Sequence, residues 1–292
     1  MVRTMDKTAD REVIRDKIYG EMPERPVHLS YKVKSTDEGF AAGKATWREV
    51  NIELDFGERE ATLPITAVIP KTEAPCPAIV YIGNEDRVPN KFLPVEEIID
   101  RGYAVINICT GVVSKNNADF KSGLCKYIAK GRRRKNAPGK IALWAWGAQR
   151  AVDYLSNLDG IDKKKIAVAG HGATAIAALL LAAEDGRIGY VIANDPFATF
   201  GQSSGLDAPY LFCPAYAEES VGDGIRELLT LCADKRVMLG SARDRAFADG
   251  EGERRIISES GISDYAYHSR AGGEYFSRED WNNYLDFFDK SR

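Results

Sequence analysis

Two hydrophobic patterns divide the chain near Pro70. Before this residue, the segment 46–55 alternates, with Val50, Ile52 and Leu54 apolar and polar residues between them. A period of two is typical of an antiparallel strand with one buried face. We therefore expect strands at 27–33, 46–55 and 61–69, preceded by a helix at 11–19.

After Pro70, continuous apolar runs predict strands that are buried on both faces, and helical segments alternate with them. The expected strands are 78–82, 104–108, 166–169, 190–193, 236–239 and 265–267, and the expected helices are 95–100, 141–158, 175–183, 224–232, 251–260 and 277–289. This alternation predicts an α/β fold with a doubly wound, mostly parallel sheet whose edge is extended by the antiparallel N-terminal strands. We expect a single domain over 1–292, with the N-terminal helix and edge strands in 1–70 and the parallel core in 71–292.

Composition narrows the class of function. The chain has 292 residues, of which 44% are hydrophobic and 28% charged, and its formal net charge is −3. This balance is typical of a globular protein with a large core and argues against binding to nucleic acid or to a membrane surface. No apolar run approaches the ~20 residues that span a bilayer, and the N-terminus lacks the apolar core of a signal peptide. We expect a cytoplasmic protein, and its oligomeric state stays open.

The five cysteines are odd in number and scattered, and none forms a Cys-x-x-Cys pair. A structural zinc site is therefore not expected, and no other pattern predicts a metal or a cofactor. Cys76, Cys109 and Cys232 lie in or beside apolar runs, so we expect them to be buried free thiols.

The most informative turn follows the expected strand 166–169. Residues 170–174 read Gly-His-Gly-Ala-Thr and lead into an alanine-rich helix. A strand, a tight turn of small residues and a helix form the setting of a nucleophile elbow, in which the central residue is strained and raised over the sheet. The central residue here is Gly172, which has no side chain. A plain strand-to-helix turn fits the pattern equally well, whereas a dinucleotide-binding turn would need glycine at Ala175.

Several segments resemble the bacterial α/β hydrolases related to glucuronoyl esterases and acetyl-xylan esterases, which are dienelactone-hydrolase-like. The similarity runs from about Tyr19 to the C-terminus. Its most specific parts are the Trp-Ala-Trp-Gly sequence at 144–147 and the Gly-His elbow; Asn194-Asp195 and the Asp280-Trp281 segment add to it. The resemblance implies an α/β-hydrolase fold and a carbohydrate ester as the substrate class.

The chain departs from that family at the catalytic positions. The family's elbow reads Gly-His-Ser, but here Gly172 takes the place of the serine. The family's C-terminal segment reads Gly-Gly-His or Gly-Lys-His, and that histidine is the general base; here Glu274 holds its position, after Gly272-Gly273. Asp244 and Asp249 are both candidates for the family's acid, because Arg245 falls where the acid often lies. No catalytic triad is therefore expected to be intact.

Other residues at the expected strand ends are candidates for a binding pocket. They are His171, Ala173, Gly83, Asn84, Asp195 and His268. Backbone N–H groups of Ala173 and of the 83–85 loop are the expected oxyanion donors. We expect the Thr174 hydroxyl to cap backbone groups rather than to attack a substrate. Ser203 and Ser204 are expected in a solvated glycine-rich loop.

One cluster of charge stands out, at Lys130, Arg132, Arg133, Arg134 and Lys135. It precedes Pro-Gly at 138–139, so an exposed connecting loop is the favoured interpretation. A site for an acidic sugar or a phosphate is the alternative.

Two hypotheses of function follow. In the first, the protein is a non-catalytic relative of a carbohydrate esterase, and its cleft binds a carbohydrate, another small molecule or a protein partner. In the second, it is an active hydrolase that works through rearranged residues such as Glu274, Asp195, Asp244 or His268. The first is favoured because the nucleophile and the base have changed together, and each loss alone costs about 10⁶ in kcat.

Overall fold

A nine-stranded sheet forms the centre of the computed structural model, which describes residues 7–128, 133–197, 208–217, 224–245 and 248–290. The strand order is β1-β2-β3-β5-β4-β6-β7-β8-β9. The strands are β1 His28–Asp37, β2 Ala45–Asp55, β3 Glu60–Pro70, β4 Cys76–Gly83, β5 Ala104–Cys109, β6 Ile161–His171, β7 Ile188–Asn194, β8 Arg236–Ala242 and β9 Asp264–Arg270. Strands β4 to β9 are parallel to one another, and β1 to β3 pair antiparallel at one edge, so the predicted mixed sheet is confirmed.

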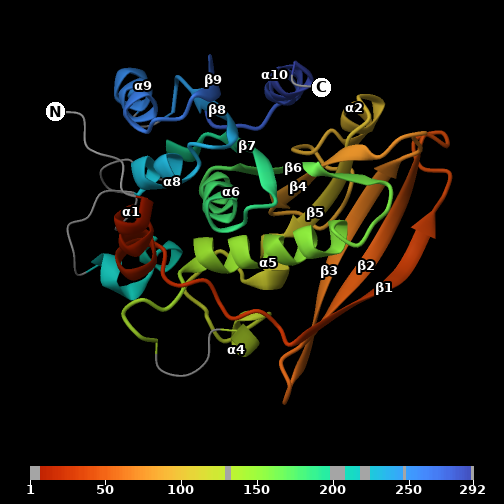
Figure 1. Cartoon of the computed structure of the whole chain (residues 1–292), viewed down its shortest axis with the longest axis horizontal. Coiled ribbons are helices and arrows are strands. Elements are labelled where there is room, and N and C mark those ends of the chain that lie inside the picture. The colour runs from red at the N-terminus through yellow and green to blue at the C-terminus, as the bar shows by residue number, and fades with distance from the viewer. Residues whose placement is uncertain (1–6, 129–132, 198–207, 218–223, 246–247, 291–292) are drawn as a thin grey trace.

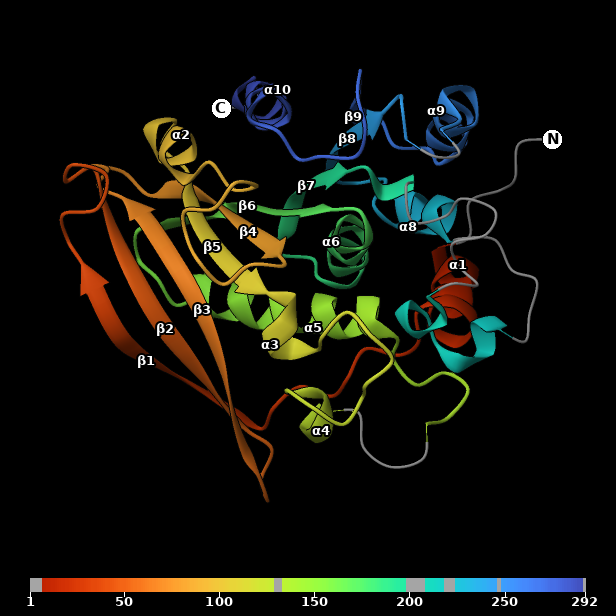
Figure 2. The same ribbon diagram turned by 180° about the vertical axis from the view of Figure 1, so that it is seen from behind.

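The two faces of the sheet carry separate apolar layers. On one face, α5 (Lys140–Leu155) and α6 (Ala173–Glu184) pack against each other and over the central strands; on the other face lie α2 (Val95–Asp100) and α10 (Arg278–Asp289). Figures 1 and 2 show these two layers on either side of the sheet. The remaining helices are α1 Lys7–Val13, the π-helix Ile14–Ile18, α3 Thr110–Val113, α4 Cys125–Ile128, the 3₁₀ turns Pro209–Leu211 and Pro214–Ala217, α8 Ile225–Leu231 and α9 Gly250–Glu259.

The alternating pattern of β2 is realised as predicted. Val50, Ile52 and Leu54 are buried, whereas the polar residues between them are not. The expected helix at 11–19 was misplaced: α1 begins earlier, at Lys7, and the segment continues as a π-helix to Ile18. The other expected elements all form, and most of the strands extend further than their apolar runs because backbone pairing continues into polar residues.

All five cysteines are free thiols, as expected, but one of the burial predictions was wrong. Cys76 and Cys232 are buried, whereas Cys109 is only partly buried because it is the last residue of β5, where the strand leaves the sheet. The described helices include none that is long and apolar enough to cross a membrane.

The basic run is only in part an exposed loop. Arg134 and Lys135 are exposed, but Arg133 is half-buried, with its guanidinium 3.5 Å from the centre of the Phe120 ring. Lys130 and Arg132 lie outside the described residues, as do Ser203 and Ser204. Cation–π packing of Arg133 cannot be read from a charge pattern, because Phe120 comes from an irregular segment.

Candidate functional site

The predicted elbow has the backbone that a nucleophile turn requires. Gly172 joins β6 to α6 with φ 58° and ψ −125°, a conformation that residues with side chains adopt only under strain. Its N–H donates to the carbonyl of Asn194 at 2.9 Å, which ties the turn to the next strand. No heavy atom of the described chain, apart from its immediate neighbours, would lie within 4 Å of a Cβ added at Gly172. The turn is therefore intact, with open space where the serine hydroxyl of a hydrolase would stand.

Strand and helix approach each other closely below this turn. A Cβ on Gly170 would lie 2.2 Å from the carbonyl oxygen of Thr174, so only glycine fits at that position. The Thr174 hydroxyl accepts a hydrogen bond from the His171 N–H at 2.9 Å and donates one to the His171 carbonyl at 3.0 Å. The predicted capping role of Thr174 is confirmed, and its hydroxyl is occupied by backbone.

His171 is held by the strand end beside it. The Asn194 side-chain amide donates to His171 Nδ1 at 2.9 Å, so the proton of the neutral ring resides on Nε2. Asn194 is fully buried; its amide also donates to the Tyr275 carbonyl at 2.8 Å, and its Oδ1 accepts from the Tyr284 hydroxyl. One buried amide thus joins β6, β7, α10 and the connection between β9 and α10.

Asp195 is the buried carboxylate of the site. It follows β7 with φ 50° and is fully buried, and its Oδ2 lies 3.8 Å from His171 Nδ1. Its Oδ1 accepts from the Ala242 N–H at 2.6 Å. Burial raises the pKa of Asp195, and the Ala242 hydrogen bond and the charges of His171 and Arg270 act in the opposite direction.

Arg270 is a functional neighbour that the sequence did not single out. Its guanidinium lies between two buried carboxylates, 3.0 Å from Asp195 Oδ2 and 3.1 Å from Asp280 Oδ2. It also donates to the carbonyls of Gly273 and Tyr275, and so fixes the loop that carries Glu274. The available signal was positional, since Arg270 is the last residue of β9, at the edge of the sheet where ligands bind.

Glu274 is exposed, and its charge acts on His171. Burial lowers the pKa of His171 below its ordinary value, and the negative charges of Asp195 and Glu274 raise it in part. Glu274, which the resemblance places at the position of the family's base, therefore acts on the elbow's imidazole through its charge.

Removing the Glu274 charge is expected to shift the titration of His171. In Glu274→Gln the pKa of His171 should fall below its wild-type value, because a negative charge that favours the protonated ring is lost. The C2–H resonances of the three histidines, followed by NMR against pH, measure this shift. An unchanged or raised His171 pKa would contradict the influence of the Glu274 charge on the ring.

The two acid candidates have other partners in the structure. Asp249 is the N-cap of α9 and accepts from the Gly252 N–H at 2.9 Å. Asp244 accepts from the Gly272 N–H at 2.7 Å and so braces the loop before Glu274. Arg245 pairs with buried Glu253. Of the acidic residues singled out in the sequence, Asp195 is the one whose carboxylate lies against the elbow histidine.

His268 lies on β9 and faces α10. Its Nε2 is 3.9 Å from Asp280 Oδ1 and 3.4 Å from the Asn283 side-chain nitrogen. The structure thus brings His171 and Asp195 together at the elbow, whereas the described contacts of His268 are with the helix behind it.

The candidate oxyanion loop is anchored to the end of β5. Gly83 is the last residue of β4, and Asn84 Oδ1 accepts from the Thr110 hydroxyl at 2.9 Å. The Glu85 carbonyl accepts from the Asn107 amide at 3.0 Å. On the other side of the elbow, Ala173 opens α6, where backbone N–H groups have no partner within the helix. Within the described residues, no three His, Cys, Asp or Glu side chains are arranged to hold a metal ion.

Comparison with solved structures supports the fold. A glucuronoyl esterase from Solibacter usitatus superposes with a TM-score of 0.85 at 22% identity, covering 98% of this chain and 92% of that one. A family 15 carbohydrate esterase from Teredinibacter turnerae, described as a glucuronoyl esterase, gives 0.83 at 17% identity, covering 98% and 84%. At these identities the likeness establishes the shared α/β-hydrolase fold, which confirms the predicted fold class.

Sequence comparison gives the family. A curated relative, carbohydrate esterase MZ0003 from an unknown prokaryotic organism, is 27% identical over an alignment of 237 residues, and the match covers 67% of this chain. The matched region spans 55% of that relative's length. The family model described as fungal glucuronyl esterase matches residues 52–204, just over half of the chain and the part that contains the elbow. The chain belongs to the glucuronoyl esterase family.

Proposed function

We propose that this chain is a non-catalytic member of the glucuronoyl esterase family that uses the elbow cleft to bind a carbohydrate. The observation that carries the proposal is the side-chain-free Gly172 at the apex of a turn that keeps its strained backbone. A serine hydrolase needs a hydroxyl or thiol to attack the carbonyl carbon and a base to take its proton. In this chain neither stands at its family position.

The contacts of Asp195, the buried carboxylate beside His171, support the same conclusion. Asp195 is engaged by Arg270 and by the Ala242 N–H, so its charge is neutralised within the fold instead of orienting a catalytic imidazole. His171 already accepts from Asn194 through Nδ1. These groups form a structural network under the cleft.

Residues near the elbow provide groups that can bind a sugar. Exposed Glu274 supplies carboxylate oxygens that accept hydrogen bonds from hydroxyl groups. The neighbouring Tyr275 ring is 41% exposed and packs against Phe92 at 5.3 Å between ring centres, which forms an aromatic platform. No heavy atom of the described residues beyond its chain neighbours would lie within 4 Å of a Cβ at Gly172, so these residues leave the apex of the turn uncovered.

The alternative is an active hydrolase in which a carboxylate activates water directly. Its support is the influence of the Glu274 charge on His171 and the uncovered apex of the turn at Gly172, where an attacking water would replace the serine hydroxyl. The two functions differ in one measurable respect, because only the second predicts turnover.

Binding is tested by calorimetry with methyl glucuronate and with xylo-oligosaccharides that carry it. Glu274→Ala is expected to weaken binding roughly tenfold, the size of one hydrogen bond to a charged group. Glu279→Ala, which removes an exposed carboxylate on α10, is the matched control and should bind as the wild type does. Absence of binding, or equal loss in both variants, would overturn the proposal.

A further inference from the structure

We propose a second ligand site, separate from the elbow: a groove beside α4 that binds an oligosaccharide bearing a uronate carboxylate. The groove has a volume of about 440 Å³ and is lined by residues from four stretches of the chain, 21–27, 56–59, 127–128 and 133–138. A volume of this size is typical of small-ligand pockets.

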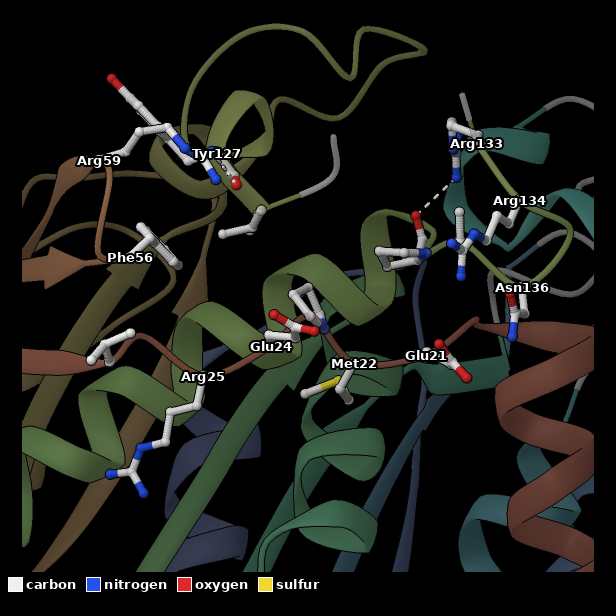
Figure 3. A pocket seen from close by; sticks show the side chains of 15 residues that line it. Glu21, Met22, Glu24, Arg25, Phe56, Arg59, Tyr127, Arg133, Arg134 and Asn136 are labelled. Carbon is white, nitrogen blue, oxygen red and sulfur yellow. Dashed lines mark hydrogen bonds between the residues drawn. The ribbon is translucent and has the colours of Figure 1, made fainter. Parts of the chain in front are cut away.

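Three arginines give the groove its charge. Figure 3 shows Arg59 on one wall and Arg133 and Arg134 on the opposite wall. Arg25 also lines it, but its guanidinium pairs with Asp153 at 3.3 Å. Segments that are far apart in the sequence thus bring guanidinium groups to one groove, which the basic run alone did not predict.

Two of these arginines are positioned by backbone carbonyls. Arg59 donates to the Tyr127 carbonyl at 3.0 Å, and Arg133 donates to the Pro138 carbonyl at 2.8 Å. Each bond uses one of five guanidinium N–H groups and restrains the side chain. The groups are therefore held before a ligand arrives, and they match the planar geometry of a carboxylate.

The remaining lining favours a sugar over a polyphosphate. Figure 3 places Glu24 and Glu21 between the two arginine walls, where carboxylates repel a dense anion but accept from hydroxyl groups. Phe56 and Tyr127 add aromatic rings, and Phe56 stacks on Trp146 at 6.4 Å between centres. A uronate-bearing oligosaccharide carries one carboxylate among many hydroxyls. Its carboxylate can bind the arginines, and its hydroxyls can donate to Glu21 and Glu24.

The groove floor is fixed to the fold. The Trp146 indole donates to the Glu24 carbonyl at 3.2 Å, and the Glu21 N–H donates to the Asn136 carbonyl at 2.9 Å. In Figures 1 and 2, α4 lies on one side of α5 and α10 lies on the other, beyond the sheet. No residue of the elbow network described above lines the groove.

The test compares two ligands that differ only in charge: a xylo-oligosaccharide carrying one free glucuronate, and its methyl ester. The free acid should bind more tightly, and raising the salt concentration should weaken its binding. Arg59→Gln/Arg134→Gln should reduce affinity for the free acid at least roughly tenfold. Arg255→Gln, an exposed arginine on α9, is the matched control and should have no effect.

The elbow variant separates this proposal from the proposed function. Glu274→Ala should leave binding of the free acid at the groove unchanged. Loss of binding in Glu274→Ala but not in the arginine variant would place the ligand at the elbow and overturn the groove. Equal affinity of the Glu274→Ala variant for acid and ester would also overturn it. If the double variant has a lower melting temperature than the wild type, the single variant Arg134→Gln, which changes an exposed residue, is used instead. It is also expected to lower the affinity for the free acid.

Discussion

Wild-type protein is expected to hydrolyse aryl acetates and methyl glucuronate esters no faster than buffer, whereas the Gly172→Ser/Glu274→His double variant should gain turnover. The double change returns the nucleophile and the base to the positions where the family has them. Because the backbone at Gly172 already has φ 58° and ψ −125°, the new hydroxyl would be raised over the sheet as in an active elbow.

Space and strain both permit the serine. A Cβ at position 172 meets nothing within 4 Å beyond its neighbours in the chain. The positive φ costs about 1–3 kcal/mol for a residue with a side chain, which a folded domain of this size can absorb. The N–H at the start of α6 and the loop after β4 remain in place as oxyanion donors.

The gain should be strongly non-additive. Serine without a base, and a base without serine, should each stay at background, because the residues of a triad act as a unit. A positioned general base contributes roughly 10²–10⁴-fold, so we expect the double variant to exceed the wild type by at least about 10² in kcat/KM. The measurement is initial rates on both ester classes, with purified protein of matched melting temperature.

Two further variants serve as controls. Gly172→Ala/Glu274→His introduces the same backbone strain without a nucleophile and should stay at background. Wild-type turnover that survives both Glu274→Ala and His268→Ala would contradict the account of a lost triad. Wild-type turnover abolished by Glu274→Ala alone would favour the alternative function, in which that carboxylate activates water.

Much of the scaffold follows from local patterns. Continuous apolar runs mark the parallel strands β4 to β8 because both of their faces are covered, whereas the edge strand β9 is exposed or half-buried. Alternation marks β2 because one of its faces is not buried. The elbow is also a local feature, since Gly170 packs against Thr174 and the Thr174 hydroxyl bonds the His171 backbone, all within five residues. These elements depend on neighbours in sequence, so the sequence predicts them.

The chemistry beneath the elbow depends on distant partners. Arg270 meets Asp195 across 75 positions and Asp280 across the following turn, and neither contact has a spacing signature. The choice between Asp244, Asp249 and Asp195 as the site's carboxylate likewise depends on register between strands. In the structure, Asp249 caps a helix and Asp244 braces a loop, both of which are common uses of aspartate that a single sequence does not separate from catalysis.

The burial of Lys140 also depends on residues distant in the sequence. A lysine at the start of a helix predicts a solvated side chain, yet Lys140 is fully buried and donates to the Ser114 hydroxyl and the Asp119 carbonyl. Burial lowers its pKa below the ordinary value. The irregular segment that covers it has no periodic pattern, so its packing cannot be derived from periodicity.

Replacing Arg270 should have the largest effect on stability among the site residues. Asp195 and Asp280 are both fully buried, and Arg270, whose side chain is 11% exposed, lies within about a hydrogen-bond length of each. Arg270→Ala would leave two buried carboxylates without their cation. Breaking a buried ion pair from one side costs about 3–5 kcal/mol, since the remaining charge keeps its desolvation penalty.

We therefore expect Arg270→Ala to lower the free energy of unfolding by about 3 kcal/mol or more, measured by urea denaturation. Arg255→Ala, which removes an exposed arginine, should change it by less than about 0.5 kcal/mol. Adding Asp195→Asn to Arg270→Ala should restore part of the loss, because an uncharged amide needs no cation. A loss below about 1 kcal/mol in Arg270→Ala, or a further loss on adding Asp195→Asn, would show that the guanidinium is not what neutralises Asp195. In that case Asp195 would be free to orient a base, and the rescue by serine and histidine should then be larger.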